Sequence, residues 1–121
     1  MNNSIYDLTV SKDQLFIPDF INNKLIVFSL PERTILSTFD VPMPHGIAVD
    51  LYGKIYICTY KQNSIMIIEN DISVCKESIQ FDYPVSIATQ DNYTLIANWG
   101  EGNSGNLIYS RDDLNSFNQF I

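Results

Sequence analysis

His45 is the only histidine of the 121-residue chain, and its side chain is the one best suited to chemistry. It stands in the order Pro44-His45-Gly46-Ile47, directly before an apolar run that predicts a β-strand. An imidazole changes charge near neutral pH, so His45 is a candidate for general acid–base catalysis or metal ligation. The competing interpretation, which we favour, is that His45 fills a structural turn position before the strand.

Further candidates follow the only tryptophan, Trp99, where a glycine-containing segment holds Glu101 and Asn103. Their carboxylate and amide oxygens are ligand types that Ca²⁺ accepts, but no calcium motif is present, so we expect no cofactor. Zinc is not expected either, because one His and the separated Cys58 and Cys75 make a poor tetrahedral set. We expect both cysteines to pack as small apolar side chains. The chain shows no phosphate-binding glycine loop and no serine in a nucleophile motif.

The charge of the chain limits its partners. The formal net charge is −7, and the seven basic residues are scattered along the sequence. Binding to nucleic acids or to anionic membranes depends on clustered Lys and Arg, so we expect neither partner. No apolar run approaches the ~20 residues of a membrane helix, and the N-terminus does not resemble a secretory signal. A cytoplasmic location is therefore the default expectation.

These candidates are set in a repeat of about 40 residues, a period typical of stacked supersecondary units. The run Leu15-Phe16-Ile17 recurs at one constant spacing as Ile55-Tyr56-Ile57 and as Leu95-Ile96-Ala97. Leu107-Ile108-Tyr109 lies two positions further than this spacing from its counterpart in the second unit, Ile65-Met66-Ile67. The difference predicts a two-residue insertion in the third unit. Each unit contains four short β-like runs with tight connections, and no stretch has a helical apolar period. This pattern predicts three antiparallel four-stranded sheets.

The second and third runs of each unit are apolar at successive positions, which predicts sheets that are covered on both faces. Four-stranded sheets that repeat every ~40 residues and stack face to face are the blades of a β-propeller. We therefore expect an all-β fold in a single domain, residues 1–121, with blades at approximately 2–41, 42–81 and 82–121. The first strand of each blade would be innermost.

The second unit resembles an NHL repeat. The resemblance is carried by Pro44-His45-Gly46-Ile47-Ala48-Val49-Asp50, by Gly53-Lys54-Ile55-Tyr56-Ile57, and by Asn63 and Ile65. It extends to the first and third units and so covers the whole chain. The aspartate that usually follows the second strand of this repeat is Asp19 in the first unit, and we expect Thr59 and Trp99 to replace it in the others. The Pro-His-Gly-Ile order is also similar to virginiamycin B lyase-like propellers, which implies a catalytic role for His45 at the channel mouth. Similarity to gluconolactonase-type propellers would imply Ca²⁺ at Glu101 and Asn103.

Strand direction places the loops on two faces. The loops after second strands and between blades share one face, which we call the loop face. We expect any ligand or partner to bind there, and its candidate residues are His45, Tyr60, Lys61, Tyr83, Trp99, Glu101 and Asn103. The opposite face receives Ser11–Asp13, Asp50–Gly53 and Gln90–Tyr93, which are typical of plain turns.

The function that we expect is a non-catalytic interaction module that binds a protein or a small ligand on the loop face. The first alternative is a lyase or lactone hydrolase with His45 and Glu101 as catalytic residues at the channel mouth. The second alternative is a fragment of a longer propeller protein. Three blades leave two open sheet faces, so we also expect a homodimer that joins its end blades into a ring of six.

Overall fold

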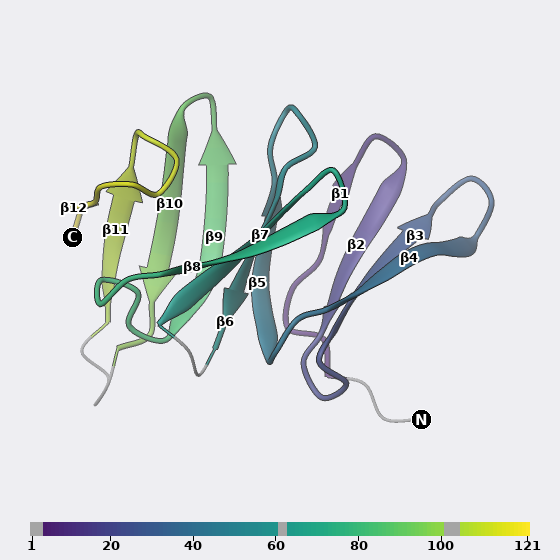
Figure 1. Cartoon of the computed structure of the whole chain (residues 1–121), viewed down its shortest axis with the longest axis horizontal. Helices are drawn as coiled ribbons and strands as arrows, with labels where there is room; N and C mark the ends of the chain where they lie inside the picture. Colours follow the sequence, from purple (N-terminus) through teal and green to yellow (C-terminus); the bar gives the residue numbers. More distant parts are fainter. Residues whose placement is uncertain (1–3, 61–62, 101–104) are drawn as a thin grey trace.

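A computed structural model describes residues 4–60, 63–100 and 105–121. Every regular element among these residues is a β-strand, and the strands form three four-stranded antiparallel sheets that stand side by side (Figure 1). The expected all-β architecture of three propeller-like blades is thereby confirmed. Blade 1 contains β1 (Thr9–Ser11), β2 (Gln14–Asp19), β3 (Lys24–Ser29) and β4 (Thr34–Asp40); blade 2 contains β5 (Pro44–Val49), β6 (Ile55–Thr59), β7 (Ser64–Glu69) and β8 (Ile72–Glu77); blade 3 contains β9 (Pro84–Gln90), β10 (Tyr93–Asn98), β11 (Asn106–Ser110) and β12 (Asn118–Gln119).

Short polar turns make each blade a meander. Lys12 and Asp13, between β1 and β2, have φ angles of 50° and 64°, and Asn70 and Asp71, between β7 and β8, have 51° and 63°. Two consecutive residues with positive φ form the kind of turn that matches the twist of an antiparallel hairpin. Asn and Asp tolerate this backbone conformation better than other side chains do, so the turn positions are visible in the sequence.

The apolar core lies between neighbouring blades. One cluster joins blades 1 and 2 and includes Phe16, Leu25 and Ile57, and a second joins blades 2 and 3 and includes Tyr56 and Ile96. Every residue of β6 is buried, as two covered faces require, whereas β3 alternates between half-buried and buried residues. Full coverage on both faces is therefore seen only for the central blade of this chain.

The pairing register corrects the alignment of the third unit. In blade 2, Ile57 pairs with Ile47 and Met66, and in blade 3 the same place is taken by Ile96, which pairs with Ile87 and Ile108. Ile96, not Ala97, is thus the counterpart of Ile57, because the turn between β9 and β10 is shorter than that between β5 and β6. A shift of one residue moves a side chain to the other face of a sheet. Ile96 and Ile108 consequently face blade 2.

The outermost strand of blade 2 is largely solvent-exposed. Five of the six residues of β8 are exposed, including Cys75, whereas Cys58 in β6 is fully buried. The expectation that both cysteines pack as apolar side chains is correct for Cys58 and wrong for Cys75. Burial therefore decreases from β6 through β7 to β8, toward the outer edge of the sheet.

Candidate functional site

The described loop face contains a recess of about 380 Å³, which we call the aromatic basin. Each blade supplies two of its lining residues, one at or before the first strand and one directly after the second strand or in the loop that follows. The pairs are Tyr6 and Phe20 from blade 1, His45 and Tyr60 from blade 2, and Val85 and Trp99 from blade 3. The basin is therefore built from equivalent positions of the repeat.

His45 lies inside β5, so the expectation that it occupies a turn before the strand is wrong. Its Nδ1 is 2.9 Å from the carbonyl oxygen of Val85, in the innermost strand of blade 3. A carbonyl oxygen only accepts, so Nδ1 carries the proton in the neutral ring and Nε2 keeps a lone pair. No hydrogen-bond partner for Nε2 is found among the described residues. His45 is thus held in one orientation with one nitrogen left for a ligand.

Ring contacts hold the basin together. Tyr6 stacks on His45 with centroids 4.7 Å apart and an interplanar angle of 4°, and Tyr60 stacks on it at 5.7 Å and 27°. Phe20 meets Tyr6, His45 and Tyr60 with interplanar angles of 88°, 87° and 71°. Stacked and edge-to-face pairs at these separations are favourable arrangements of aromatic quadrupoles. The ring of Phe20 therefore stands roughly at right angles to the stacked rings of Tyr6 and His45.

The structure brings together four of the seven residues expected on the loop face. His45, Tyr60 and Trp99 line the basin, and Tyr83 contacts Tyr60 with ring centroids 5.8 Å apart. Trp99 is 54% exposed, so it is not part of the buried core. The other expected site residues, Lys61, Glu101 and Asn103, lie outside the described residues.

Sequence reasoning missed Tyr6 and Phe20. Tyr6 lies before a short first strand and carries no strand signal of its own. Phe20 does have a signal, because it stands one full repeat before Tyr60 and occupies the same place after a second strand. The repeat also places Asn98, not Trp99, at the position of Asp19 and Thr59, since each of these three is the last residue of its second strand.

All three polar residues hydrogen-bond to segments next to their strand ends, and Thr59 Oγ1 donates to the carbonyl oxygen of Ser64 at the start of β7. Asp19 accepts hydrogen bonds from the backbone N and the side-chain Nδ2 of Asn22, as expected for a loop carboxylate. Asn98 accepts a hydrogen bond from the backbone N of Asp82 and donates to the carbonyl oxygen of Gln80. Asp19 therefore holds the loop that carries Phe20, and Asn98 holds the connection from β8 to β9.

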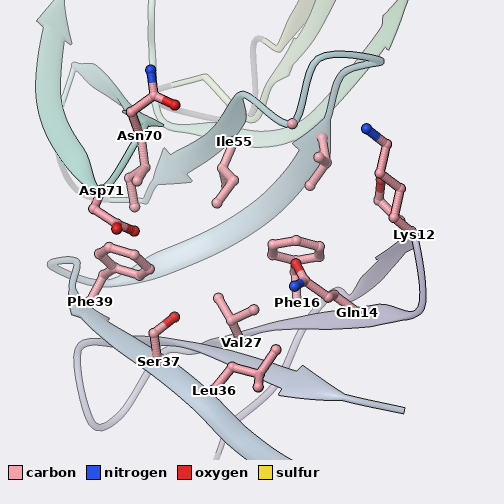
Figure 2. A pocket seen from close by; sticks show the side chains of 14 residues that line it. Lys12, Gln14, Phe16, Val27, Leu36, Ser37, Phe39, Ile55, Asn70 and Asp71 are labelled. Atoms are coloured by element: carbon pink, nitrogen blue, oxygen red, sulfur yellow. The ribbon is translucent and has the colours of Figure 1, made fainter. Parts of the chain in front are cut away.

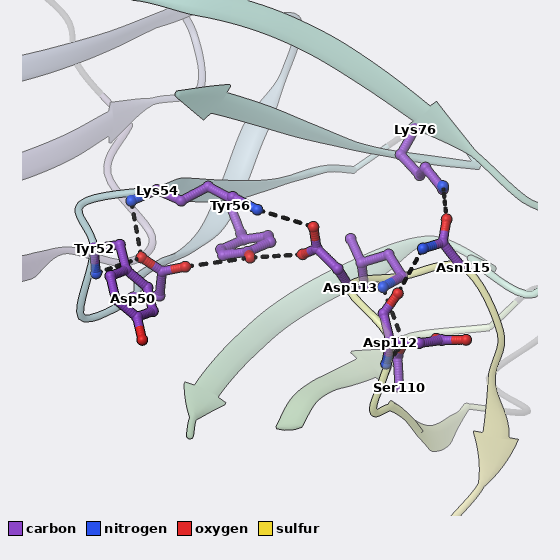
Figure 3. Close-up of polar contacts among 10 residues, drawn as sticks. Asp50, Tyr52, Lys54, Tyr56, Lys76, Ser110, Asp112, Asp113 and Asn115 are labelled. Carbon is purple, nitrogen blue, oxygen red and sulfur yellow. Dashed lines mark hydrogen bonds and ion pairs between the residues drawn. The ribbon is translucent and has the colours of Figure 1, made fainter. Parts of the chain in front are cut away.

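The opposite face is more than a set of plain turns, because it joins blades 2 and 3 by a polar network (Figure 3). Asp113, between β11 and β12, accepts hydrogen bonds of 2.9 Å from Lys54 Nζ and from Tyr56 Oη. Asp50, on the other side of Tyr56, accepts from the backbone N atoms of Tyr52 and Lys54. Asp113 is separated in the sequence from Tyr56 by 57 positions and from Lys54 by 59, so the sequence spacing alone could not reveal this network.

The contacts of this network shift the pKa values of three titratable residues, Lys54, Tyr56 and Asp113. Hydrogen bonds from Lys54 and Tyr56 hold the pKa of Asp113 below its usual range, against the opposing effect of burial. The hydrogen bond to Asp113 raises the pKa of Lys54. Burial first, and then the neighbouring carboxylates, raise the pKa of the Tyr56 phenol. Tyr56 therefore remains a neutral hydrogen-bond donor, and the arrangement fits a clamp between two blades.

We expect Asp113→Asn to lower the free energy of unfolding by about 1 kcal/mol at pH 7, because the ion pair is partly exposed and screened. The folded-state pKa of Asp113 is lowered, so its contribution is present above the ordinary value of 3.8 and is lost as the pH falls through the folded-state pKa. Urea unfolding at pH 7 and pH 3 should show the difference between wild type and variant shrinking at the lower pH. An equal difference at both values would contradict the clamp.

A second recess of about 240 Å³ lies between blades 1 and 2 (Figure 2). Its walls include Phe16, Val27 and Phe39, and its rim carries Lys12 and Asp71. The recess opens where the two sheets diverge away from the centre, with the small side chain of Ser37 on one wall. Phe16 and Phe39 are the aromatic residues of its described lining, fewer than in the aromatic basin.

Within the described part of the chain, no group of three or more His, Cys, Asp or Glu side chains is placed to hold a metal ion. Among the same residues, no helix has the length and hydropathy needed to cross a membrane.

Comparison with known proteins bears on the fold. No family model and no curated protein matches the sequence. Among solved structures, a catalytically inactive virginiamycin B lyase from Staphylococcus aureus with quinupristin matches at 20% identity and a TM-score of 0.76, over 96% of this chain and 40% of that chain. This chain is a partial β-propeller. Hydrazine synthase of Kuenenia stuttgartiensis (18% identity, TM-score 0.73, 87% of this chain and 32% of that chain) and the WD40 repeats of RRP9 (14%, 0.76, 96% and 36%) are similar in the same way.

The partial propeller thus spans two-fifths or less of these three solved chains. They include both enzymes and a WD40-repeat protein, and at such low identity the likeness concerns the fold alone. Propellers serve unrelated functions, so the function of this chain has to be argued from its own site.

Proposed function

We propose that this partial propeller is a non-catalytic interaction module of NHL-type repeats that binds a small ligand or an apolar side chain of a partner in the aromatic basin. The single observation that carries the proposal is the convergence of six residues from three blades on one recess of the loop face. A concave site with apolar walls and few oriented polar groups is typical of ligand binding. His45 Nε2 supplies such a group.

The composition of the basin favours binding over catalysis. Its described lining contains aromatic rings, one imidazole and Val85, but neither a carboxylate nor a serine or cysteine nucleophile. General acid–base catalysis usually needs a second group to hold or receive the proton. The hydrogen-bond partner of His45 in the described chain is a backbone carbonyl, which orients the ring without supplying a proton.

We expect p-cresol, a neutral ring with one hydroxyl donor, to bind the basin and to shift two NMR signals in parallel. The chain has one His and one Trp, so the His45 imidazole protons and the Trp99 indole N–H give unique resonances. Both residues line the basin, and an aromatic ligand bound in it changes the ring-current field at each. A saturable titration with one dissociation constant for both signals is the expected result.

Tyr6→Ala should weaken this binding at least threefold, since it removes the ring stacked on His45. Tyr52→Ala is the matched control, because Tyr52 is 89% exposed and lies on the opposite face. Shifts that do not saturate, or that are equally affected by both variants, would refute the basin as a binding site.

A lyase is the second candidate function, favoured by one specific observation. His45 is oriented at the loop face with Nε2 available, and the fold is similar to that of virginiamycin B lyase. Incubation with quinupristin followed by chromatography discriminates the two functions. Conversion that disappears in His45→Ala would support the lyase, whereas unchanged quinupristin is expected for the binding module.

We also propose that two copies of the chain pack end to end and close a ring of six blades. Blade 1 has an open face with Leu15, Ile17, Ile26 and Phe28, all half-buried. The equivalent residues of blade 2, one repeat later, are Ile55, Ile57, Met66 and Ile68, and they pack on blade 1. The open face of blade 1 therefore has the composition of a face that packs on another blade.

The open face of blade 3 has the complementary character. Its half-buried residues are Leu95, Ala97, Leu107 and Tyr109. By the pairing register they occupy the places of Tyr56, Cys58, Ile65 and Ile67, which are turned toward blade 3. The interface seen twice within the chain would thus be repeated between blade 3 of one copy and blade 1 of the other. A two-fold arrangement would cover both open faces in both copies.

Light scattering after size exclusion should give twice the chain mass of 13.8 kDa. The physical reason is the apolar area that two open faces would otherwise expose to water. A well-folded monomer would refute ring closure, and soluble material found only as aggregates would favour the interpretation that further blades of a longer protein complete the ring.

A further inference from the structure

The aromatic basin combines stacked rings with one ring, Phe20, that stands at nearly right angles to two of them. Tyr6 and His45 lie parallel to each other, and Phe20 stands at 88° to Tyr6 and 87° to His45. The face of an aromatic ring is the negative part of its quadrupole, so rings set around one space attract a positive charge placed between them. A neutral apolar ligand gains only the binding free energy that comes from burying its apolar surface.

The basin keeps solvent-exposed ring surface. Tyr6 is 58% exposed and Trp99 is 54% exposed. Burying a large aromatic side chain is favourable, so a ligand that covers these two would gain binding free energy. These two residues come from the first and the third blade, and the rings of Phe20, His45 and Tyr60 lie with them around the recess. A ligand seated there would contact ring surface supplied by all three blades.

The charge around the basin suits the same kind of ligand. The described lining residues include neither Lys nor Arg. Asp7 follows Tyr6 in the chain and Asp19 precedes Phe20, while Lys61, which follows Tyr60, lies outside the described residues. The chain as a whole carries a formal net charge of −7, and a field of this sign raises the local concentration of cations.

We infer that the ligand of the basin is an organic cation, a quaternary or alkylated ammonium group on a small apolar body. This inference rests on the proposed binding function and names its ligand class. An ammonium surrounded by methyl groups cannot satisfy a hydrogen-bonding pocket, but it fits a space walled by ring faces. The hydroxyl or amide of such a ligand would donate to His45 Nε2. Anionic ligands are disfavoured, because the described lining supplies no cationic side chain.

The test compares choline with 3,3-dimethylbutan-1-ol, which has the same shape and hydroxyl group but a carbon in place of the charged nitrogen. The His45 imidazole and Trp99 indole resonances report on both ligands in the same sample conditions. Choline is expected to bind about two- to thirtyfold more tightly than the neutral alcohol, the range for exposed to desolvated cation–π contacts. Tyr6→Leu keeps apolar bulk but removes a ring face, so it should reduce this preference.

Tyr52→Leu, on the opposite face, is the matched control and should leave the preference unchanged. Equal affinities for choline and for the alcohol would overturn the cation inference while leaving the binding function intact. If neither these two ligands nor p-cresol gives saturable shifts, the basin is no binding site and both proposals fail. A preference for choline that survives Tyr6→Leu and Trp99→Leu would also overturn the inference, because the charge would then be sensed elsewhere.

Discussion

Replacing Gly46 by alanine is expected to lower the free energy of unfolding by about 3 kcal/mol or more, enough to unfold a chain of marginal stability. A Cβ at Gly46 would lie 2.5 Å from the carbonyl oxygen of Val85 and 2.7 Å from the Cα of Ser86. Both atoms belong to the backbone of β9, so no flexible side chain can move aside. The innermost strands of blades 2 and 3 would have to separate, and the hydrogen bond between His45 Nδ1 and Val85 would be lost with them.

Gly53→Ala is the matched control for this substitution. Gly53 has a φ of 87°, but nothing lies within 4 Å of its added Cβ. Its replacement should cost about 1 kcal/mol, through backbone strain alone. Urea unfolding followed by far-ultraviolet circular dichroism measures both variants. If Gly46→Ala loses no more stability than Gly53→Ala, the close approach of β5 to β9 is wrong.

Ile26→Glu is expected to convert the proposed dimer into a monomer, which halves the mass measured by light scattering. Ile26 is half-buried in the middle of the open face of blade 1, where it pairs with Ile17 and Thr38 across the sheet. In a closed ring it would meet blade 3 of the other copy, and burying an unpaired carboxylate there costs several kcal/mol. A two-fold assembly contains the substitution twice.

The control for the open face is Ile79→Glu, since Ile79 is 93% exposed in the connection from β8 to β9. This variant should keep the mass of the wild type, and both variants should keep the far-ultraviolet spectrum of a β protein. A wild-type dimer that persists in Ile26→Glu would place the interface elsewhere on the molecule. In that case the end blades would be covered by something other than a second copy.

The repeat was readable from the sequence because it depends on local physics. Turn positions such as Asp13, Asn70 and Asp91 need residues that tolerate positive φ, and buried strands such as β6 need unbroken apolar runs. Strand direction then follows from the short connections, and it places His45, Tyr60 and Trp99 on one face. The three blades and the face that carries the candidate site were therefore predictable.

Distances between blades decided the rest. Tyr6 has no strand signal, yet it stacks on His45 because the segment before β1 passes over the start of β5. Asp113 accepts hydrogen bonds from Lys54 and Tyr56 across the interface between blades 2 and 3, which no spacing in the sequence predicts. Contacts of this kind depend on how two sheets are placed, and the placement results from side-chain volumes summed over the whole interface.

The sequence by itself thus determined three antiparallel sheets, their order and their two loop faces, since strand period, turn composition and chain connectivity are local properties. Only the tertiary structure decided the register of β10, which turns Ile96 inward and Leu95 outward. A strand shifted by one residue keeps its apolar composition and its turns, but every side chain changes face. Packing against a neighbouring blade selects one of the two registers, and with it the residues that line the open face.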